Sequence, residues 1–235
     1  MKKLSFLLVA LVTVFTSCEK VVGEGMLVNE TRTATSFSGI ESELSANIDF
    51  VQGNDYKVEL TAQQNILNVL ETPVVNNKLI VRFKNNVRVR LHEQITIKVT
   101  APSISSLGLS GSGNVNVLSA LSANEISLRV SGSGNVTVPL VDCSQLEANI
   151  SGTGNISIAN GTAASEKLKI SGSGHIDVKS VSAKSVTTIT SGSGSMKVNA
   201  AETLNVTISG SGSVYYWGTP AVTTNISGSG KVIHQ

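Results

Sequence analysis

The second half of the chain alternates apolar and polar residues on both sides of a recurring phrase, Ser-Gly-Ser/Thr-Gly. In most repeats, apolar residues stand one and three positions before the phrase and five and seven positions after its first serine. This period-two alternation predicts two short strands per repeat, each with one face turned inward. The phrase recurs at intervals of 21, 20, 20, 20, 18 and 18 residues, beginning at Ser110, Ser131, Ser151, Ser171, Ser191, Ser209 and Ser227.

Two strands and a return segment in about 20 residues are typical of one coil of a parallel β-helix, whose coils stack about 4.8 Å apart. We therefore predict an all-β solenoid for residues 33–235, with seven repeats over 101–235 and degenerate coils or a strand-rich cap over 33–100. A leucine-rich repeat needs a leucine phrase that is missing here, and a propeller blade is about twice as long. The aromatic content of 4% suits a narrow, aliphatic interior.

The glycines of the phrase are expected to be architectural. The chain must bend at the same place in every coil, and glycine supplies a positive φ or a close approach there. Asn114, Asn135 and Asn155 follow the phrase, and such a column can hydrogen-bond from coil to coil. These turn glycines are Gly111, Gly113, Gly132, Gly134, Gly152, Gly154, Gly172, Gly174, Gly192, Gly194, Gly210, Gly212, Gly228 and Gly230.

The first half keeps the strand character and adds one short helix. Residues 62–71 carry apolar residues at helical spacing, with Thr61 as the predicted N-cap and Pro73 just past the end. Strand-like runs are predicted at 37–40, 48–53, 56–60, 79–83 and 95–99.

Residues 1–17 are predicted to be an export signal and not part of this fold. Lys2 and Lys3 precede an apolar run of about a dozen residues, which is too short for a permanent membrane span. Cys18 follows two small residues as in a lipobox, so we predict lipidation of Cys18; an ordinary secretory signal cut nearby is the alternative. Residues 18–32 would then be the lipidated end and a tether. The protein would be an outer-membrane lipoprotein of the cell envelope, facing either side.

Charge and cysteine content add two constraints. Removal of Lys2 and Lys3 from the 18 basic residues leaves 16, which balance the 16 acidic ones, so the charge does not indicate a nucleic-acid partner. With Cys18 acylated, Cys143 is the remaining thiol, and we expect it to be a small buried hydrophobe and not a nucleophile.

Two clusters are candidates for a binding surface. A basic cluster either binds an acidic partner or is a solvated face that guards a strand edge. Tyr215 and Trp217 alternate outward, where they could stack on sugars, or they belong to a cap that closes the last coils. The basic cluster contains Arg82, Lys84, Arg88, Arg90 and Lys98.

The residues do not show a catalytic arrangement. A glycosidase needs two carboxylates poised across a bond, and a calcium repeat needs an aspartate in each coil. His175 and Asp177 could share a face, but no third metal ligand is evident. We therefore expect no enzyme activity, no cofactor and no metal. The carboxylates after residue 100 do not occupy matching positions in adjacent repeats: Glu125, Asp142, Glu147, Glu166, Asp177 and Glu202.

The chain resembles the putative auto-transporter adhesin, head GIN domain family. The resemblance rests on Phe37-Ser38-Gly39-Ile40, Val51-Gln52-Gly53, the short helix before Pro73, Leu79-Ile80-Val81 and the Ser-Gly-Ser-Gly-Asn-Val repeats, and covers residues 34–232. It implies a right-handed parallel β-helix in the cell envelope and brings no catalytic or ligand site.

Three functional hypotheses follow. The leading one is a lipid-anchored, non-catalytic binding or adhesion module that holds a glycan or an envelope protein on outward strand residues. The second is a structural spacer that self-associates through the ends or edges of the β-helix. The third, a polysaccharide-active enzyme, has the least support in the residues.

Overall fold

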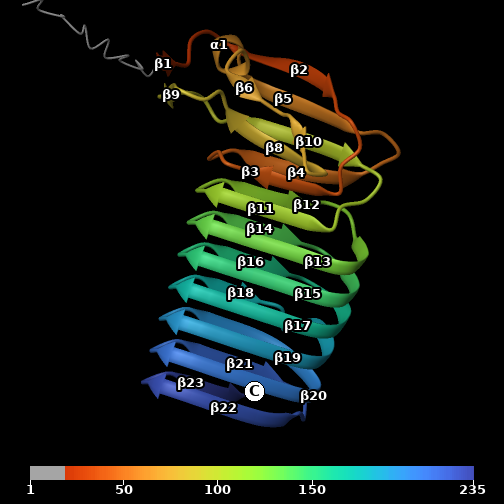
Figure 1. Cartoon of the computed structure of the whole chain (residues 1–235), viewed down its shortest axis with the longest axis vertical. Helices are drawn as coiled ribbons and strands as arrows, with labels where there is room; N and C mark the ends of the chain where they lie inside the picture. Colours follow the sequence, from red (N-terminus) through yellow and green to blue (C-terminus); the bar gives the residue numbers. More distant parts are fainter. Residues whose placement is uncertain (1–18) are drawn as a thin grey trace, which may run out of the picture.

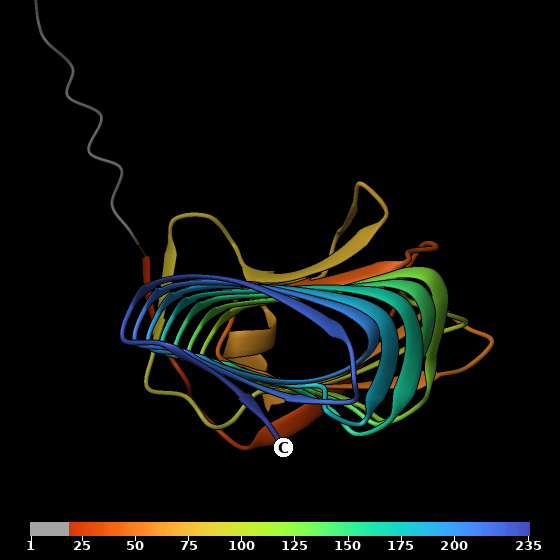
Figure 2. The ribbon, with the colours of Figure 1, turned by 90° about the horizontal axis from the view of Figure 1, so that it is seen from below.

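The computed structural model describes residues 19–235, so the predicted signal peptide and Cys18 lie outside the described residues. It confirms an all-β solenoid with coils of about 20 residues and one short helix (Figure 1). Seen along the stack, the coils superpose as a flattened ring with a narrow interior (Figure 2). Two walls of stacked strands enclose this interior.

We call one wall the long wall, because four of its strands have 12 residues each. Its strands stack in parallel from β8 onward, and β7 pairs antiparallel to β8. The order along the stack is β7 (Val74–Val75), β8 (Lys78–Phe83), β3 (Gly39–Ser42), β11 (Ser106–Gly111), β13 (Leu121–Gly132), β15 (Val141–Gly152), β17 (Gly161–Gly172), β19 (Val181–Gly192), the second part of β20 (Ser195–Gly210) and β22 (Ala221–Gly228).

The opposite wall, the short wall, is parallel from β10 onward, and β2 and β5 add antiparallel strands at its N-terminal end. Its order is β2 (Leu27–Thr33), β5 (Lys57–Gln63), β10 (Thr96–Ala101), β4 (Asn47–Gln52), β12 (Asn114–Val117), β14 (Asn135–Val138), β16 (Asn155–Ile158), β18 (His175–Asp177), the first part of β20, β21 (Ser213–Trp217) and β23 (Lys231–His234).

Inward residues of successive coils stand in register and form aliphatic columns. Val130 pairs with Ile150 and Ile150 with Ile170, and each is at most 2% exposed. Burial of one such side chain stabilises the fold by about 1.5–3 kcal/mol. The repeat thus encodes the core directly, because each coil places the same kind of side chain over the one before it.

The glycines of the phrase form the corner between the walls. The first glycine of each phrase has φ between 119° and 135°, a region that other residues resist. At the second glycine, a side chain would collide with the backbone: a Cβ on Gly154 would lie 2.3 Å from the carbonyl oxygen of Gly134. The first glycine therefore provides the bend, and both glycines allow the close contact between coils.

Asparagines beside this corner form a hydrogen-bonded ladder along the short wall. Asn155 Nδ2 donates to Asn135 Oδ1 at 2.7 Å, and Asn135 Nδ2 donates to Asn114 Oδ1 at 2.9 Å. Asn114 Nδ2 in turn donates to Asn47 Oδ1 at 3.1 Å, so the ladder extends into β4 of the first half. It ties four coils together outside the core.

The first half contributes one coil out of sequence order. The coil of β3 and β4 lies between the coil of β8 and β10 and the coil of β11 and β12. This part of the first half therefore contains coils that continue the stack of the repeats. The remaining strands cover the N-terminal end of the interior as a mixed cap.

The predicted helix is present but much shorter than expected. Helix α1 spans only Gln64–Leu67, with Gln63 at the N-cap position. Thr61 lies in β5 and is not the cap, and β6 (Leu70–Glu71) occupies the end of the predicted helical run. The first two residues of that run, Ala62 and Gln63, pair with Val28 and Leu27 of β2 and so extend β5 instead of starting the helix.

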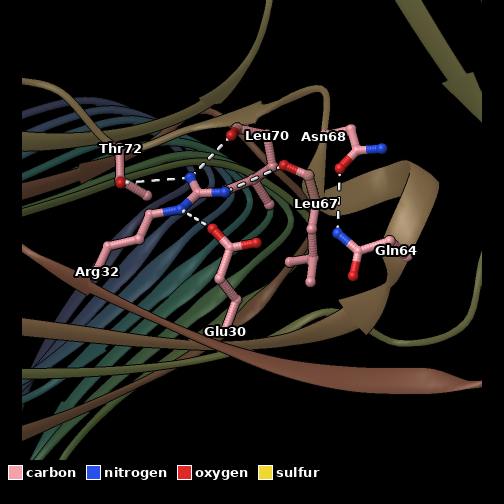
Figure 3. A network of polar contacts seen from close by, with 7 residues as sticks. All are labelled: Glu30, Arg32, Gln64, Leu67, Asn68, Leu70 and Thr72. Carbon is pink, nitrogen blue, oxygen red and sulfur yellow. Dashed lines mark hydrogen bonds and ion pairs between the residues drawn. The ribbon is translucent and has the colours of Figure 1, made fainter.

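The segment predicted to be a tether contains two strands. β1 (Glu19–Val22) pairs with β9 (Val87–Arg90), and β2 pairs with β5 over seven residues. Arg32 on β2 anchors the cap: its guanidinium contacts Glu30 Oε1 at 2.6 Å and donates to the carbonyl oxygens of Leu67 and Leu70 at 3.1 and 2.8 Å (Figure 3). The described chain is therefore structured from its first residues.

The other end of the stack is open in the described part of the chain. β22 pairs only with β20 and β23 only with β21. Val222 and Ile226 of β22 are 39% and 40% exposed, whereas Leu204 and Ile208 beneath them are at most 1% exposed. Among residues 19–235, no helix has the length and hydrophobicity to span a membrane.

Candidate functional site

The outer face of the long wall is hollowed where β13, β15, β17 and β19 lie side by side. A groove of about 580 Å³ runs over Arg129, Glu147, Asn149, Lys167 and Lys169, with Ser131, Ser151 and Ser171 along it. A second groove of about 480 Å³ includes Glu125 and shares Glu147 and Lys167 with the first. We call the two grooves together the long-wall trough.

Strand register brings these side chains together from separate coils. Arg129, Asn149 and Lys169 are register partners, and Glu147 pairs with Lys167 in the neighbouring row. Because partners on adjacent strands share a face, all five side chains lie on the outer surface.

The charges in the trough are unevenly paired. Asn149 Nδ2 donates to Glu147 Oε1 at 2.9 Å, and Arg129 Nη2 lies 3.9 Å from Glu147 Oε2. Within residues 19–235, no acidic side chain forms an ion pair with Lys167 or Lys169. The trough therefore combines one engaged carboxylate with two unpaired ammonium groups, which favours an anionic ligand.

Three acidic residues border the second groove, but they do not converge in it. Glu125 and Glu147 point outward, whereas Glu166 lies at an inward position between Leu146 and Val186. Glu166 is 2% exposed, and neither of its carboxyl oxygens has a hydrogen-bond partner. Burial raises the pKa of Glu166 to about 8. Its carboxyl group is on the core side of the sheet and cannot meet Glu147 across a sugar bound outside.

One serine–histidine contact appears that sequence spacing did not show. His175 Nδ1 lies 2.7 Å from Ser195 Oγ in the next coil. The nearby Asp177 is engaged by Lys197, whose Nζ lies 3.3 Å from Asp177 Oδ2. The pair thus lacks a carboxylate that could orient the imidazole as a general base. In the described part of the chain, no group of three or more His, Cys, Asp or Glu is placed to hold a metal ion.

The predicted basic cluster is divided among separate elements. Arg82 on β8 pairs with Glu71 at 3.3 Å, and Lys98 on β10 lies 3.6 Å from Glu59. A hydrogen bond from Lys57 to Glu59, with the charges of both lysines, lowers the pKa of Glu59. Lys84, Arg88 and Arg90 remain exposed near or on β9, with no ion pair in the described residues.

The two predicted aromatic residues lie at the opposite end of the stack from the basic ones (Figure 1). Tyr215 and Trp217 are both half-buried on β21, and Lys179 Nζ lies 5.9 Å from the centroid of the Trp217 ring. The ring of Tyr216 between them packs 4.9 Å from that of His234. The structure therefore does not unite the basic and aromatic clusters in one surface.

Cys143 is half-buried and unpaired among the described residues. Burial, and then the nearby carboxylates of Glu166 and Asp142, raise the pKa of its thiol to about 11. The thiolate is the reactive form, so this environment opposes a role as nucleophile.

Sequence reasoning missed the trough. Its residues were visible as polar positions between inward aliphatic ones, and the period of about 20 places Arg129, Asn149 and Lys169 in one column. The period alone does not show that the surface is hollowed there.

Comparisons with known proteins agree with this architecture. The family model described as "Putative auto-transporter adhesin, head GIN domain" matches residues 36–220. A putative adhesin from Bacteroides fragilis NCTC 9343 is 23% identical, with a TM-score of 0.85 over 92% of this chain and 100% of that chain. A putative adhesin from Parabacteroides merdae ATCC 43184 is 22% identical, with a TM-score of 0.78 over 92% and 99%.

A structure named "Putative lipid binding protein", from Parabacteroides distasonis ATCC 8503, is 21% identical, with a TM-score of 0.75 over 92% of this chain and 100% of that chain. At these identities the structural matches establish the shared fold. The comparison with curated proteins finds no match.

Proposed function

We propose that this chain, which belongs to the putative auto-transporter adhesin, head GIN domain family, is a non-catalytic binding module of the bacterial cell envelope. Its ligand is an acidic polysaccharide held in the long-wall trough. The observation that carries the proposal is the pair of unpaired ammonium groups, Lys167 and Lys169, beside Arg129 in a trough edged by serine hydroxyls.

The chemistry of the trough favours a sugar acid over other ligands. Ammonium and guanidinium groups match carboxylates or sulfates, while Asn149 and the serine hydroxyls can exchange hydrogen bonds with sugar hydroxyls. A lipid chain needs an apolar cavity, and the side chains of the trough are mostly polar. The open surface over four strands suits a polymer that makes many weak contacts, whose avidity exceeds the affinity of any single contact.

The test is binding of residues 19–235 to polygalacturonate and to uncharged dextran at low and high salt. The trough variant replaces Arg129, Lys167 and Lys169 with threonine, which already follows Lys167 in its column at Thr187. We expect the native chain to prefer polygalacturonate, with binding that weakens in salt, and the trough variant to lose about tenfold or more in affinity.

The matched control replaces Arg88 and Arg90 with threonine, and its affinity should be unchanged. Equal binding by the native chain and the trough variant would contradict the proposal. The release of new reducing ends or unsaturated sugars from the polysaccharide would instead support an enzyme.

We also propose that acylation of Cys18 anchors the module to the outer membrane, on the strength of the lipobox-like sequence before it. Metabolic labelling with a fatty-acid analogue should mark the native chain and not a Cys18→Ser variant. Protease treatment of intact cells would then distinguish a surface-facing from a periplasmic module.

A second function, a self-associating spacer, is favoured by the open C-terminal end. Exposed Val222 and Ile226 and the unpaired outer edges of β22 and β23 could pair with another copy. Light scattering should then show a mass that rises with concentration, and Ile226→Lys should reduce this rise. A strict monomer at every concentration would count against self-association.

A further inference from the structure

The N-terminal end of the stack carries a basic and apolar surface that the proposed function does not use. β1 and β9 lie side by side there as a two-stranded ribbon, at the far end from β22 and β23 (Figure 1). Lys20 is the register partner of Arg88, and Val22 is the partner of Arg90. Because side chains alternate along a strand, all four point to the same face of the ribbon.

Exposed apolar side chains lie on this face or in the loops that follow its two strands. Met26 and Leu91 are 88% and 84% exposed, and Val22 is 45% exposed. Leu91 also has φ of 46°, a conformation that a leucine rarely adopts, and it is held there with its side chain in solvent.

Hydrogen bonds gather these residues although they are distant in sequence. The backbone amide of Gly23 donates to the carbonyl oxygen of Leu91 at 2.9 Å. The side chain of Gln63 donates to the carbonyl oxygen of Gly25 at 3.1 Å and accepts from the amide of Glu93 at 3.2 Å. The segments that carry Met26 and Leu91 are therefore fixed on either side of Gln63.

We propose that this surface, defined by Lys20, Val22, Met26, Arg88, Arg90 and Leu91 and called the ribbon face, rests on an anionic lipid membrane. Three exposed cations suit lipid phosphates, and the exposed apolar side chains can enter the boundary between headgroups and acyl chains. Within residues 19–235, none of the three cations has an acidic partner in an ion pair.

The acidic residues nearby do not neutralise the ribbon face. Glu19 alternates to the opposite side of β1 from Lys20, and Glu24 and Glu93 belong to the flanking loops. Lys84, just before β9, adds a further exposed cation.

The position of β1 in the chain supports this orientation. β1 begins at Glu19, so a lipid on the preceding cysteine would be about 4 Å of chain from the first strand. Lys20, one residue further along β1, and its register partner Arg88 would then lie within about one Debye length, roughly 8 Å, of the charged headgroups. Contact of the ribbon face with the membrane would fix the orientation of the lipid-anchored protein, with the long wall projecting away from the membrane.

The test uses residues 19–235, which contain every described strand and helix and carry no lipid, so that only the protein surface can hold the chain to a vesicle. Co-sedimentation is measured with phosphatidylcholine vesicles that contain or lack phosphatidylglycerol. The charge variant replaces Lys20, Arg88 and Arg90 with threonine. The apolar variant is Met26→Ser with Leu91→Asn, since asparagine tolerates the positive φ of Leu91.

We expect the native chain to bind the phosphatidylglycerol vesicles. The affinity of the charge variant for these vesicles should be lower by about tenfold or more. The apolar variant should also bind more weakly, while the Lys167→Thr/Lys169→Thr control should match the native chain. Absence of vesicle binding, or equal binding by the charge variant, would overturn the proposal. So would stronger binding to a DNA duplex than to vesicles at the same salt.

The polysaccharide assay reports separately on the trough, because the charge variant keeps all trough residues. If the native chain binds the vesicles but not the polysaccharide, the proposed function is rejected and the ribbon-face proposal stands. If the native chain binds the polysaccharide but not the vesicles, the ribbon-face proposal is rejected and the proposed function stands.

Discussion

Replacement of Glu166 should stabilise the protein. Glu166 is buried between Leu146 and Val186, and its two carboxyl oxygens make no hydrogen bond. Burial raises its pKa from 4.5 to about 8, so the folded state holds the proton that the unfolded chain releases above pH 4.5. At neutral pH this difference opposes folding.

The sign and size of the effect of Glu166 on the free energy of unfolding follow from proton linkage. Below pH 4.5 both states are protonated and Glu166 has no pH-dependent effect on the free energy of unfolding. Between pH 4.5 and about 8 only the unfolded state is ionised, so stability falls by about 1.4 kcal/mol per pH unit and then levels off. At pH 7 the cost is roughly 3 kcal/mol.

Urea unfolding of residues 19–235 at pH 5, 7 and 8.5 measures this cost. Glu166→Leu, which continues the aliphatic column, should be more stable than the native chain by roughly 3 kcal/mol at pH 7 and by much less at pH 5. Glu166→Gln serves as the control: it removes the titration but leaves a buried polar group, so the stability difference between it and the native chain should depend on pH with the same slope. If that difference is the same at all three pH values, the carboxyl group is not protonated in the folded state and the reasoning fails.

Three further substitutions test the corner, the ladder and the cap. Gly152→Ala should cost about 3 kcal/mol or more in urea unfolding, since its φ is 129° and its Cβ would lie 2.3 Å from a carbonyl oxygen of the preceding coil; Ser151→Ala should be nearly neutral. Asn135→Ala should cost about 1–3 kcal/mol, because both neighbours in the ladder lose a partner, and a cost equal to that of exposed Ser157→Ala would refute the ladder's role. Arg32→Met should speed amide hydrogen exchange in α1 and leave exchange in β17 unchanged; equal exchange in α1 would show that the arginine does not hold the cap.

The sequence predicted the repeats well because their information is local and periodic. Inward positions such as Val130, Ile150 and Ile170 recur at a fixed spacing, and each packs on its counterpart in the next coil. Alternation, turn chemistry and period all indicate the same structure there, which is the condition under which local patterns determine a fold.

The first half was harder to predict because its contacts are not periodic. All seven residues of β2 are exposed or half-buried, so the strand has little hydrophobic alternation and resembles a tether in sequence. The run after Thr61 satisfies helical spacing, yet pairing of Ala62 and Gln63 with β2 converts its start into strand. Nothing local indicates that β3 and β4 form a coil between elements that come later in the chain.

The same periodicity that makes the core predictable explains why ligand binding depends on the outward residues and not on the inward columns. An inward residue must match its neighbours in adjacent coils, so the column from Val130 through Ile150 and Ile170 stays nearly uniform, and Glu166 is costly because it departs from such a column. An outward residue packs against little, so each coil can carry a different side chain at small cost to stability. The outward column changes its chemistry at almost every coil, through Arg129, Asn149, Lys169, Ile189, Thr207 and Asn225. Ligand specificity on this scaffold therefore depends on which outward columns carry unpaired charge, and moving Lys167 and Lys169 to the matching positions of another coil should move the binding site with them.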